Sequence, residues 1–138
     1  MNAISMDIVV RYSETGGLGF VSHSSIYDWY DMIQYEFLRK HGFEYAQMEQ
    51  QGHMLVTIEN SCKFLAPAYL GQELRISMSV KEITPLKVVF EYDIIRKKDG
   101  VRIAKGHSVH ACVDRNFRPV VFETQLPGLH RLLKQLAE

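Results

Sequence analysis

The chain has 138 residues, of which 46% are hydrophobic, so it is the size of one domain and can bury a substantial core. Sixteen lysines and arginines balance sixteen aspartates and glutamates, and no net charge favours nucleic acid or an anionic membrane. No apolar run approaches the roughly 20 residues that span a bilayer, and the first residues lack a signal-peptide pattern. We expect one domain over residues 1–138, cytoplasmic, with no nucleic-acid partner and no membrane span.

The first part of the chain predicts a strand, a loop and a long helix. Apolar residues alternate along residues 4–12, which indicates a half-buried strand with Ile4, Met6, Ile8, Val10 and Tyr12 facing inward. Residues 13–22 are rich in glycine and serine and predict a loop. A helix is expected over residues 24–41, and a short helical turn over 45–50. Residues at helical spacing predict that this long helix is covered on most of its surface: Ile26, Tyr27, Trp29, Tyr30, Ile33, Phe37 and Leu38.

The rest of the chain predicts four strands and a closing helix. In each of the first three strands, alternate side chains are expected to face inward. These are Val56, Ile58, Cys62 and Phe64 in the first strand, Leu74, Ile76, Met78 and Val80 in the second, and Val88, Phe90, Tyr92 and Ile94 in the third. The fourth should cover residues 101–114, after the Asp99-Gly100 hairpin signal. A short amphipathic helix is expected around Leu129, Leu132, Leu133 and Leu136. Cys62 and Cys112 have no Cys-x-x-Cys spacing, so both should be free thiols.

This order of elements predicts an α+β domain. A curved antiparallel sheet has one face to cover, and a single helix that is apolar around its circumference can be wrapped by it. Pairing of two copies edge to edge would remove an exposed strand edge of this sheet. We therefore expect a homo-oligomer.

The segment Tyr12-Ser-Glu-Thr-Gly-Gly-Leu-Gly-Phe-Val-Ser-His23 resembles the active-site signature of the 4-hydroxybenzoyl-CoA thioesterase-like hotdog family, in its short-chain acyl-CoA thioesterase branch. Thr15, Gly19, Val21 and His23 fit in register, Glu14 fits the acidic position, and Gly16 stands where the family carries its catalytic aspartate. The resemblance continues through 56–68 and Gly71-Gln-Glu-Leu and covers roughly residues 5–122. It implies a hotdog fold of one long helix wrapped by about five strands, and a homodimer or homotetramer.

The resemblance also implies hydrolysis of an acyl-CoA, or of an acyl group on a carrier protein. The thioester carbonyl would be polarised at the start of the helix, at His23, where unpaired N–H groups carry a partial positive charge. Because Gly16 has no side chain to act as a base, the catalytic candidates are Glu14, Asp31, His23 and Tyr12. Each also has a structural interpretation: local hydrogen bonds for Glu14, pocket lining for His23, a hydrogen bond to the sheet for Asp31 and core packing for Tyr12.

The candidate binding residues are Gly16 and Gly19, which allow a ligand to approach the loop closely, and Lys63 and Lys87, which could meet coenzyme A phosphates. Coenzyme A enters here as part of the substrate, and we expect no cofactor. His107 and His110 have a spacing that sends strand side chains to opposite faces, so no metal site is expected.

Two alternatives remain open. Gly16 motivates the first, a catalytically weak or inactive member that binds acyl thioesters, pantetheine or a carrier protein. The second is a hydratase or dehydratase of the same fold, which would need an Asp/His pair that this sequence does not present.

Overall fold

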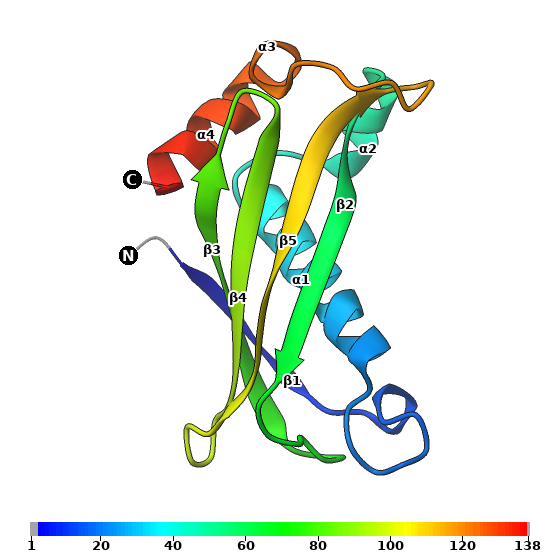
Figure 1. The fold of residues 1–138 in the computed structure, drawn as a ribbon, viewed down its shortest axis with the longest axis vertical. Coiled ribbons are helices and arrows are strands. Elements are labelled where there is room, and N and C mark those ends of the chain that lie inside the picture. Colours follow the sequence, from blue (N-terminus) through cyan, green and yellow to red (C-terminus); the bar gives the residue numbers. More distant parts are fainter. Residues whose placement is uncertain (1–2, 138) are drawn as a thin grey trace.

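A computed structural model describes residues 3–137 as one curved sheet wrapped around a long helix (Figure 1). The sheet is antiparallel, with strand order β1-β3-β4-β5-β2. Its strands are β1 (Ile4–Val9), β2 (His53–Phe64), β3 (Glu73–Ile83), β4 (Lys87–Arg96) and β5 (Arg102–Asp114). The helices are α1 (His23–Lys40), α2 (Tyr45–Gln50), α3 (Phe122–Gln125) and α4 (Pro127–Ala137), and a 3₁₀ turn, η1, covers Tyr12–Glu14. The predicted α+β architecture is confirmed.

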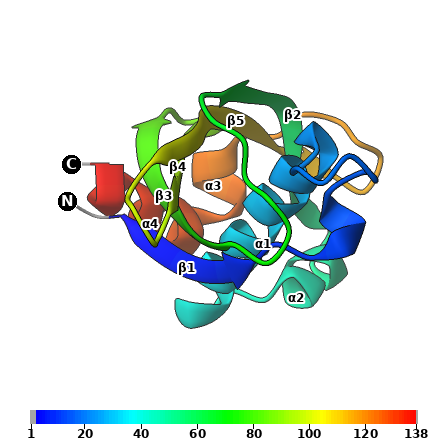
Figure 2. The ribbon, with the colours of Figure 1, turned by 90° about the horizontal axis from the view of Figure 1, so that it is seen from below.

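Helix α1 lies within the curve of the sheet, as the view from below shows (Figure 2). Four of its side chains have no exposed surface: Ile26, Trp29, Tyr30 and Ile33. The Tyr30 ring stacks on Tyr92 of β4 with 3.7 Å between ring centroids, and its hydroxyl donates to the Ser61 carbonyl of β2 at 3.0 Å. That hydroxyl and that carbonyl fill the space where a side chain at position 106 would begin, so β5 requires Gly106 there.

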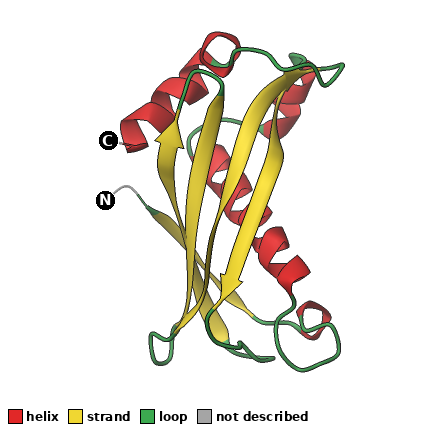
Figure 3. Cartoon of the chain, viewed as in Figure 1, coloured by secondary structure: helices red, strands yellow, loops and turns green. Residues whose placement is uncertain are grey.

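The C-terminal helix α4 packs against β3, beside one end of the sheet (Figure 3). Its apolar face buries Leu129 and Leu133, as the leucine spacing predicted. His130 Nε2 lies 2.9 Å from the Thr84 carbonyl, which ties the helix to the loop between β3 and β4. The short helix α3 that precedes it was not predicted.

Three inward-facing predictions, for Tyr12, Val56 and Ile58, were wrong because the chain departs from a regular strand. Tyr12 is 71% exposed, since β1 ends at Val9 and the chain turns into η1. In β2, a bulge between Thr57 and Glu59 inserts Ile58, which is 51% exposed. Leu55 and Thr57, opposite Cys112 and His110, therefore face α1, whereas Val56 does not. Past the bulge Cys62 and Phe64 lie on the predicted face, opposite Gly106 and Ala104, but Phe64 is 43% exposed. Both cysteines are free thiols.

A chain of hydrogen bonds crosses the core from α1 to β2. Gln34 Nε2 donates to the Tyr92 hydroxyl at 2.6 Å, and that hydroxyl lies 2.7 Å from Ser108 Oγ. Ser108 Oγ is 2.7 Å from His110 Nε2, and His110 Nδ1 is 3.3 Å from Thr57 Oγ1. His110 is 2% exposed, and this burial lowers its pKa to about 4. The buried imidazole is consequently neutral at neutral pH.

The burial of His110 predicts a loss of stability as the pH falls from about 6.5 toward 4. Between these values the unfolded chain binds a proton at His110 and the folded chain does not, so the free energy of unfolding decreases. The decrease is at most on the order of 3 kcal/mol, and it is complete below the pKa of the folded state. Urea denaturation at a series of pH values measures it.

The variant His110→Gln should flatten this part of the stability profile. Ile76→Val is the matched control, because it removes one methylene from the same core without a titrating group. It should lower stability by about 1 kcal/mol at every pH and leave the slope unchanged. A His110→Gln profile as steep as that of the wild type would contradict the assignment.

Candidate functional site

The first turn of α1 is chemically open. Ser22 is the N-cap residue, but its side chain does not cap the helix. Its hydroxyl instead lies 3.1 Å from those of Ser24 and Ser25. Among residues 3–137, the backbone N–H groups of His23 and Ser24 have no hydrogen-bond acceptor. These two donors, at the positive end of the helix dipole, are placed to polarise a carbonyl group.

Glu14 holds the preceding loop against this helix start through both its carbonyl and its carboxylate. The carbonyl accepts hydrogen bonds from the Ser22 N–H at 3.0 Å and the Ser25 hydroxyl at 3.0 Å. One carboxylate oxygen accepts the Trp29 indole N–H at 2.7 Å, and the other accepts the Arg11 N–H at 2.8 Å. The side chain of Arg11 adds an ion pair at 3.3 Å. Glu14 thereby connects η1 to the first two turns of α1.

The Glu14 carboxyl stays ionised in this setting although it is only 8% exposed. Burial raises its pKa, but the hydrogen bonds from the Arg11 N–H, the Trp29 indole and the Arg11 guanidinium outweigh that effect, and the net pKa is lowered. Both oxygens already accept a strong donor. This carboxylate is therefore suited to holding the loop in place rather than to taking a proton from water.

The loop between η1 and α1 depends on glycine. Gly16, Gly17 and Gly19 have φ angles of 59°, 81° and 86°, in the left-handed region that L side chains rarely adopt. Gly16 is the mildest case: aspartate and asparagine tolerate its conformation best, and a Cβ there would meet only Ser22 Cβ, at 3.7 Å. A bridge between Phe20 and Tyr69 joins the end of this loop to the turn that follows β2.

The other catalytic candidates lie at different points along α1 and its loop. His23 is exposed as the first residue of α1, and Tyr12 is exposed in η1 near the same end. Asp31 lies eight residues beyond His23, about 12 Å along the helix. Surrounding protein atoms raise the pKa of Asp31 by desolvation, and the Asp28 carboxylate raises it further. The structure thus places Tyr12 and Glu14, in η1, beside the first turn of α1, where His23 is exposed, and Asp31 lies apart from them.

Asp31 lines a groove of about 450 Å³ between α1 and β2. The groove is mainly apolar, and its polar groups come from both walls. Its remaining lining residues are Gln34, Tyr35, Tyr45, Met54, Leu55, Val56 and Thr57. The sequence analysis selected neither Gln34 nor Thr57 as a site residue. Thr57 was missed because the bulge in β2 turns it, rather than Val56, toward α1.

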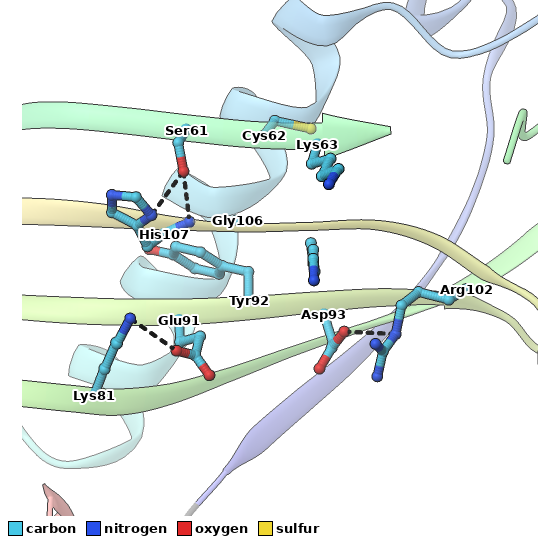
Figure 4. Close-up of a pocket in the computed structure, with 11 residues that line it drawn as sticks. Ser61, Cys62, Lys63, Lys81, Glu91, Tyr92, Asp93, Arg102, Gly106 and His107 are labelled. Atoms are coloured by element: carbon cyan, nitrogen blue, oxygen red, sulfur yellow. Dashed lines mark hydrogen bonds and ion pairs between the residues drawn. The ribbon is translucent and has the colours of Figure 1, made fainter. Parts of the chain in front are cut away.

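The two predicted phosphate-binding lysines lie at opposite ends of the sheet. Lys63 pairs with Lys105 and Lys87 pairs with Ala111, which are six residues and about 20 Å apart on β5. Lys63 lies on the sheet face turned away from α1, among charges of both signs (Figure 4). There Lys81 pairs with Glu91 at 3.6 Å and Arg102 with Asp93 at 3.1 Å. Lys63 and Lys87 cannot bind one phosphate together.

His107 lies on that same outer face, where its Nδ1 is 2.8 Å from Ser61 Oγ, whereas His110 is buried against α1. The predicted separation of these two histidines is confirmed. Within the described part of the chain, no group of three His, Cys, Asp or Glu side chains is placed to hold a metal ion. No helix between residues 3 and 137 has the length and apolar character needed to cross a membrane.

Comparisons with known proteins agree with this architecture. The chain is 27% identical over 131 residues to YneP of Bacillus subtilis, a candidate acyl-CoA thioesterase, with 94% of each protein covered. It is 25% identical over 105 residues to the acyl-CoA thioester hydrolase YbgC of Escherichia coli, covering 76% of this chain and 78% of that one.

Among solved structures, the DHNA-CoA thioesterase of Staphylococcus aureus matches with a TM-score of 0.89 at 22% identity, over 96% of this chain and 89% of that chain. This likeness confirms the hotdog fold. Residues 18–103 match the sequence profile described as the thioesterase superfamily. The chain therefore belongs to the thioesterase superfamily.

Proposed function

We propose that this protein hydrolyses acyl thioesters, carried by coenzyme A or by acyl carrier protein, to a carboxylate and a free thiol. The open first turn of α1 is the observation that carries the proposal, because two unpaired N–H groups follow a loop in which Gly16, Gly17 and Gly19 have no side chain. The similarity to acyl-CoA thioester hydrolases supports the same chemistry.

In the proposed mechanism, the thioester carbonyl oxygen accepts a hydrogen bond from the His23 N–H. A water molecule attacks the carbonyl carbon while the His23 imidazole accepts one of its protons. The carbon–sulfur bond then breaks, and the proton passes to the departing thiolate. The Tyr12 hydroxyl, exposed at the same end of α1, would orient the water.

His23 is the base that the geometry supports best. Its imidazole makes no hydrogen bond or ion pair with any described residue, and it belongs to the residue whose N–H polarises the carbonyl. Glu14 has both carboxylate oxygens engaged, and Asp31 lies about 12 Å along the helix. We assign Glu14 a positioning role and Asp31 a place in the acyl groove.

We also propose which residues bind the substrate and how two copies of the chain associate. Gly16 and Gly19 leave room for the thioester. Lys63 lies on the outer face of the sheet, near the end of β2 whose following turn meets the loop before α1, and we propose it, rather than Lys87 at the far end, as the phosphate contact. Strand β2 forms an edge of the sheet in the single chain. A second copy pairing there would cover this edge, so we propose a homodimer or a homotetramer.

A specific observation favours a second candidate function. Position 16 has space for a Cβ and a left-handed backbone that aspartate and asparagine tolerate better than other L residues, yet it carries glycine. A protein that keeps the carbonyl-binding site and lacks an effective base would bind acyl thioesters, pantetheine or a carrier protein without hydrolysing them.

The role of His23 predicts that His23→Gln lowers kcat/KM for acyl-CoA hydrolysis by about 10²–10⁴-fold, because the base is lost and the backbone N–H is kept. Thiol release measured across short, long and aromatic acyl-CoAs provides the test. His53→Gln, at the opposite end of the sheet, is the control and should retain wild-type rates. Unchanged hydrolysis by His23→Gln would eliminate His23 as the base.

The geometry at Gly16 predicts that Gly16→Asp increases hydrolysis by about 10²-fold or more, since it adds a carboxylate beside the carbonyl site. Gly16→Asn is the matched control, with the same shape and backbone tolerance but no base, and it should not increase the rate. An inactive wild type with an active Gly16→Asp would identify the natural protein as a binder. Equal rates in both variants would show that a carboxylate at position 16 does not reach the substrate.

The positioning role of Glu14 predicts that Glu14→Gln destabilises the fold by about 1–3 kcal/mol, because a buried donor loses its acceptor. The rate should fall without a change in the shape of its pH profile. Trp29→Phe removes the partner donor, and the double variant should cost less than the two single changes summed. If the hydrolysis rate of Glu14→Gln no longer rose with pH as the wild-type rate does, Glu14 would instead be identified as the base.

A further inference from the structure

One stripe of α1 leads from the carbonyl site into the groove. His23, Tyr27, Asp31 and Gln34 are spaced by four, four and three residues, so they follow one another along one face of the helix. Gln34 is eleven residues beyond His23, which corresponds to about 16 Å along the axis. An acyl group whose carbonyl is held at His23 and which lies along this stripe ends between Gln34 and the facing wall of β2.

The hydrogen-bonded chain through the core has both of its ends in this groove. Gln34 and Thr57 line the groove from α1 and from β2. The connecting side chains, Tyr92, Ser108 and His110, are all buried. We call these five residues the relay.

The direction of the hydrogen bonds in the relay follows from counting its protons. The Gln34 amide donates to the Tyr92 hydroxyl, which must then donate to Ser108, because no other acceptor is present for that buried proton among the described residues. Ser108 consequently donates to His110 Nε2. His110 is neutral, so its proton is on Nδ1 and is donated to Thr57 Oγ1.

The relay therefore gives the groove a fixed polarity. Thr57 has its hydroxyl proton free to donate, and Gln34 has its carbonyl oxygen free to accept. With Gln34 donating to Tyr92, the opposite tautomer of His110 would leave the buried proton of either Tyr92 or Ser108 without an acceptor, at a cost of about 1–3 kcal/mol. The Asp31 carboxylate on the same stripe adds a second acceptor and a negative charge.

We propose that Gln34 and Thr57 form a specificity subsite for a hydroxyl group at the far end of the acyl chain, with Tyr92, Ser108 and His110 as positioning residues. A hydroxyl can accept a hydrogen bond from Thr57 and donate one to the Gln34 carbonyl. A terminal methyl can do neither, and a terminal carboxylate is repelled by Asp31. The substrate class is an extended acyl thioester that is hydroxylated up to about 16 Å from its carbonyl. This inference rests on the proposed function for the location of that carbonyl.

The tautomer of His110 tests the relay without any ligand. Long-range ¹H–¹⁵N correlation of histidine-labelled protein should show a protonated Nδ1 and an unprotonated Nε2 for His110. Thr57→Val should shift the Nδ1 resonance, and Thr57→Ser should restore it. A protonated Nε2 in the wild-type protein would overturn the assigned polarity.

Affinity for non-hydrolysable coenzyme A thioethers tests the subsite. Alkyl tails of graded length, each ending in a hydroxyl, a methyl or a carboxylate, are titrated calorimetrically. At the length that reaches Gln34, the hydroxyl tail should bind about 10-fold more tightly than the methyl tail, which corresponds to one or two net hydrogen bonds. Thr57→Val should abolish this preference and Thr57→Ser should keep it, as should the control Tyr35→Phe on the same groove.

Binding does not require turnover, so the two proposals fail separately. An inactive protein that still prefers the hydroxyl tail would refute the hydrolase alone. A hydrolysing protein without that preference at any length, or with the preference intact in Thr57→Val, would refute the subsite alone.

Discussion

The placement of Glu14 against the start of α1 is the interaction on which the rest of the site depends. A buried carboxylate is costly unless donors surround it, and here the Trp29 indole, the Arg11 N–H and the Arg11 guanidinium supply them. The same residue uses its carbonyl to engage Ser22 and Ser25. Because these serines bond to Glu14 and to each other, none of them caps the helix, and the first turn is left open to a substrate carbonyl.

Polarisation of the carbonyl and activation of water are physically separable in this arrangement. The first depends on backbone N–H groups and is indifferent to side-chain identity, whereas the second needs a titratable group within reach. Gly16, which lies beside Ser22 in a left-handed backbone conformation, supplies no such group. What remains near the open turn is the exposed His23 side chain, so the mechanism we propose assigns two roles to this residue, one for its N–H and one for its imidazole.

The core contains polar side chains as well as apolar ones, and these buried polar groups need hydrogen-bond partners within the protein. The relay from Gln34 to Thr57 does so across three strands, and every buried member has a partner. The two ends of the relay, Gln34 and Thr57, line the groove at the surface. In the subsite we propose, proton positions inside the core set which groups in the groove donate and which accept, so His110 would link interior packing to ligand preference.

The sequence by itself determined the helices and strands, and their inward faces, wherever hydrophobic periodicity within one element was regular. The period of α1 and the alternation in β3 and β4 were sufficient to identify Trp29, Tyr30, Ile76 and Tyr92 as core residues. The same logic failed at Tyr12, Val56 and Ile58, since a turn and a bulge shift the alternation without a distinctive residue pattern.

Only the tertiary structure decided the pairings between distant residues: the engagement of Glu14 by Trp29, the 20 Å between Lys63 and Lys87, and the meeting of Gln34 with Tyr92. The physical reason is that periodicity reports which face of an element is buried. Strand register and the path of the chain determine what that face meets.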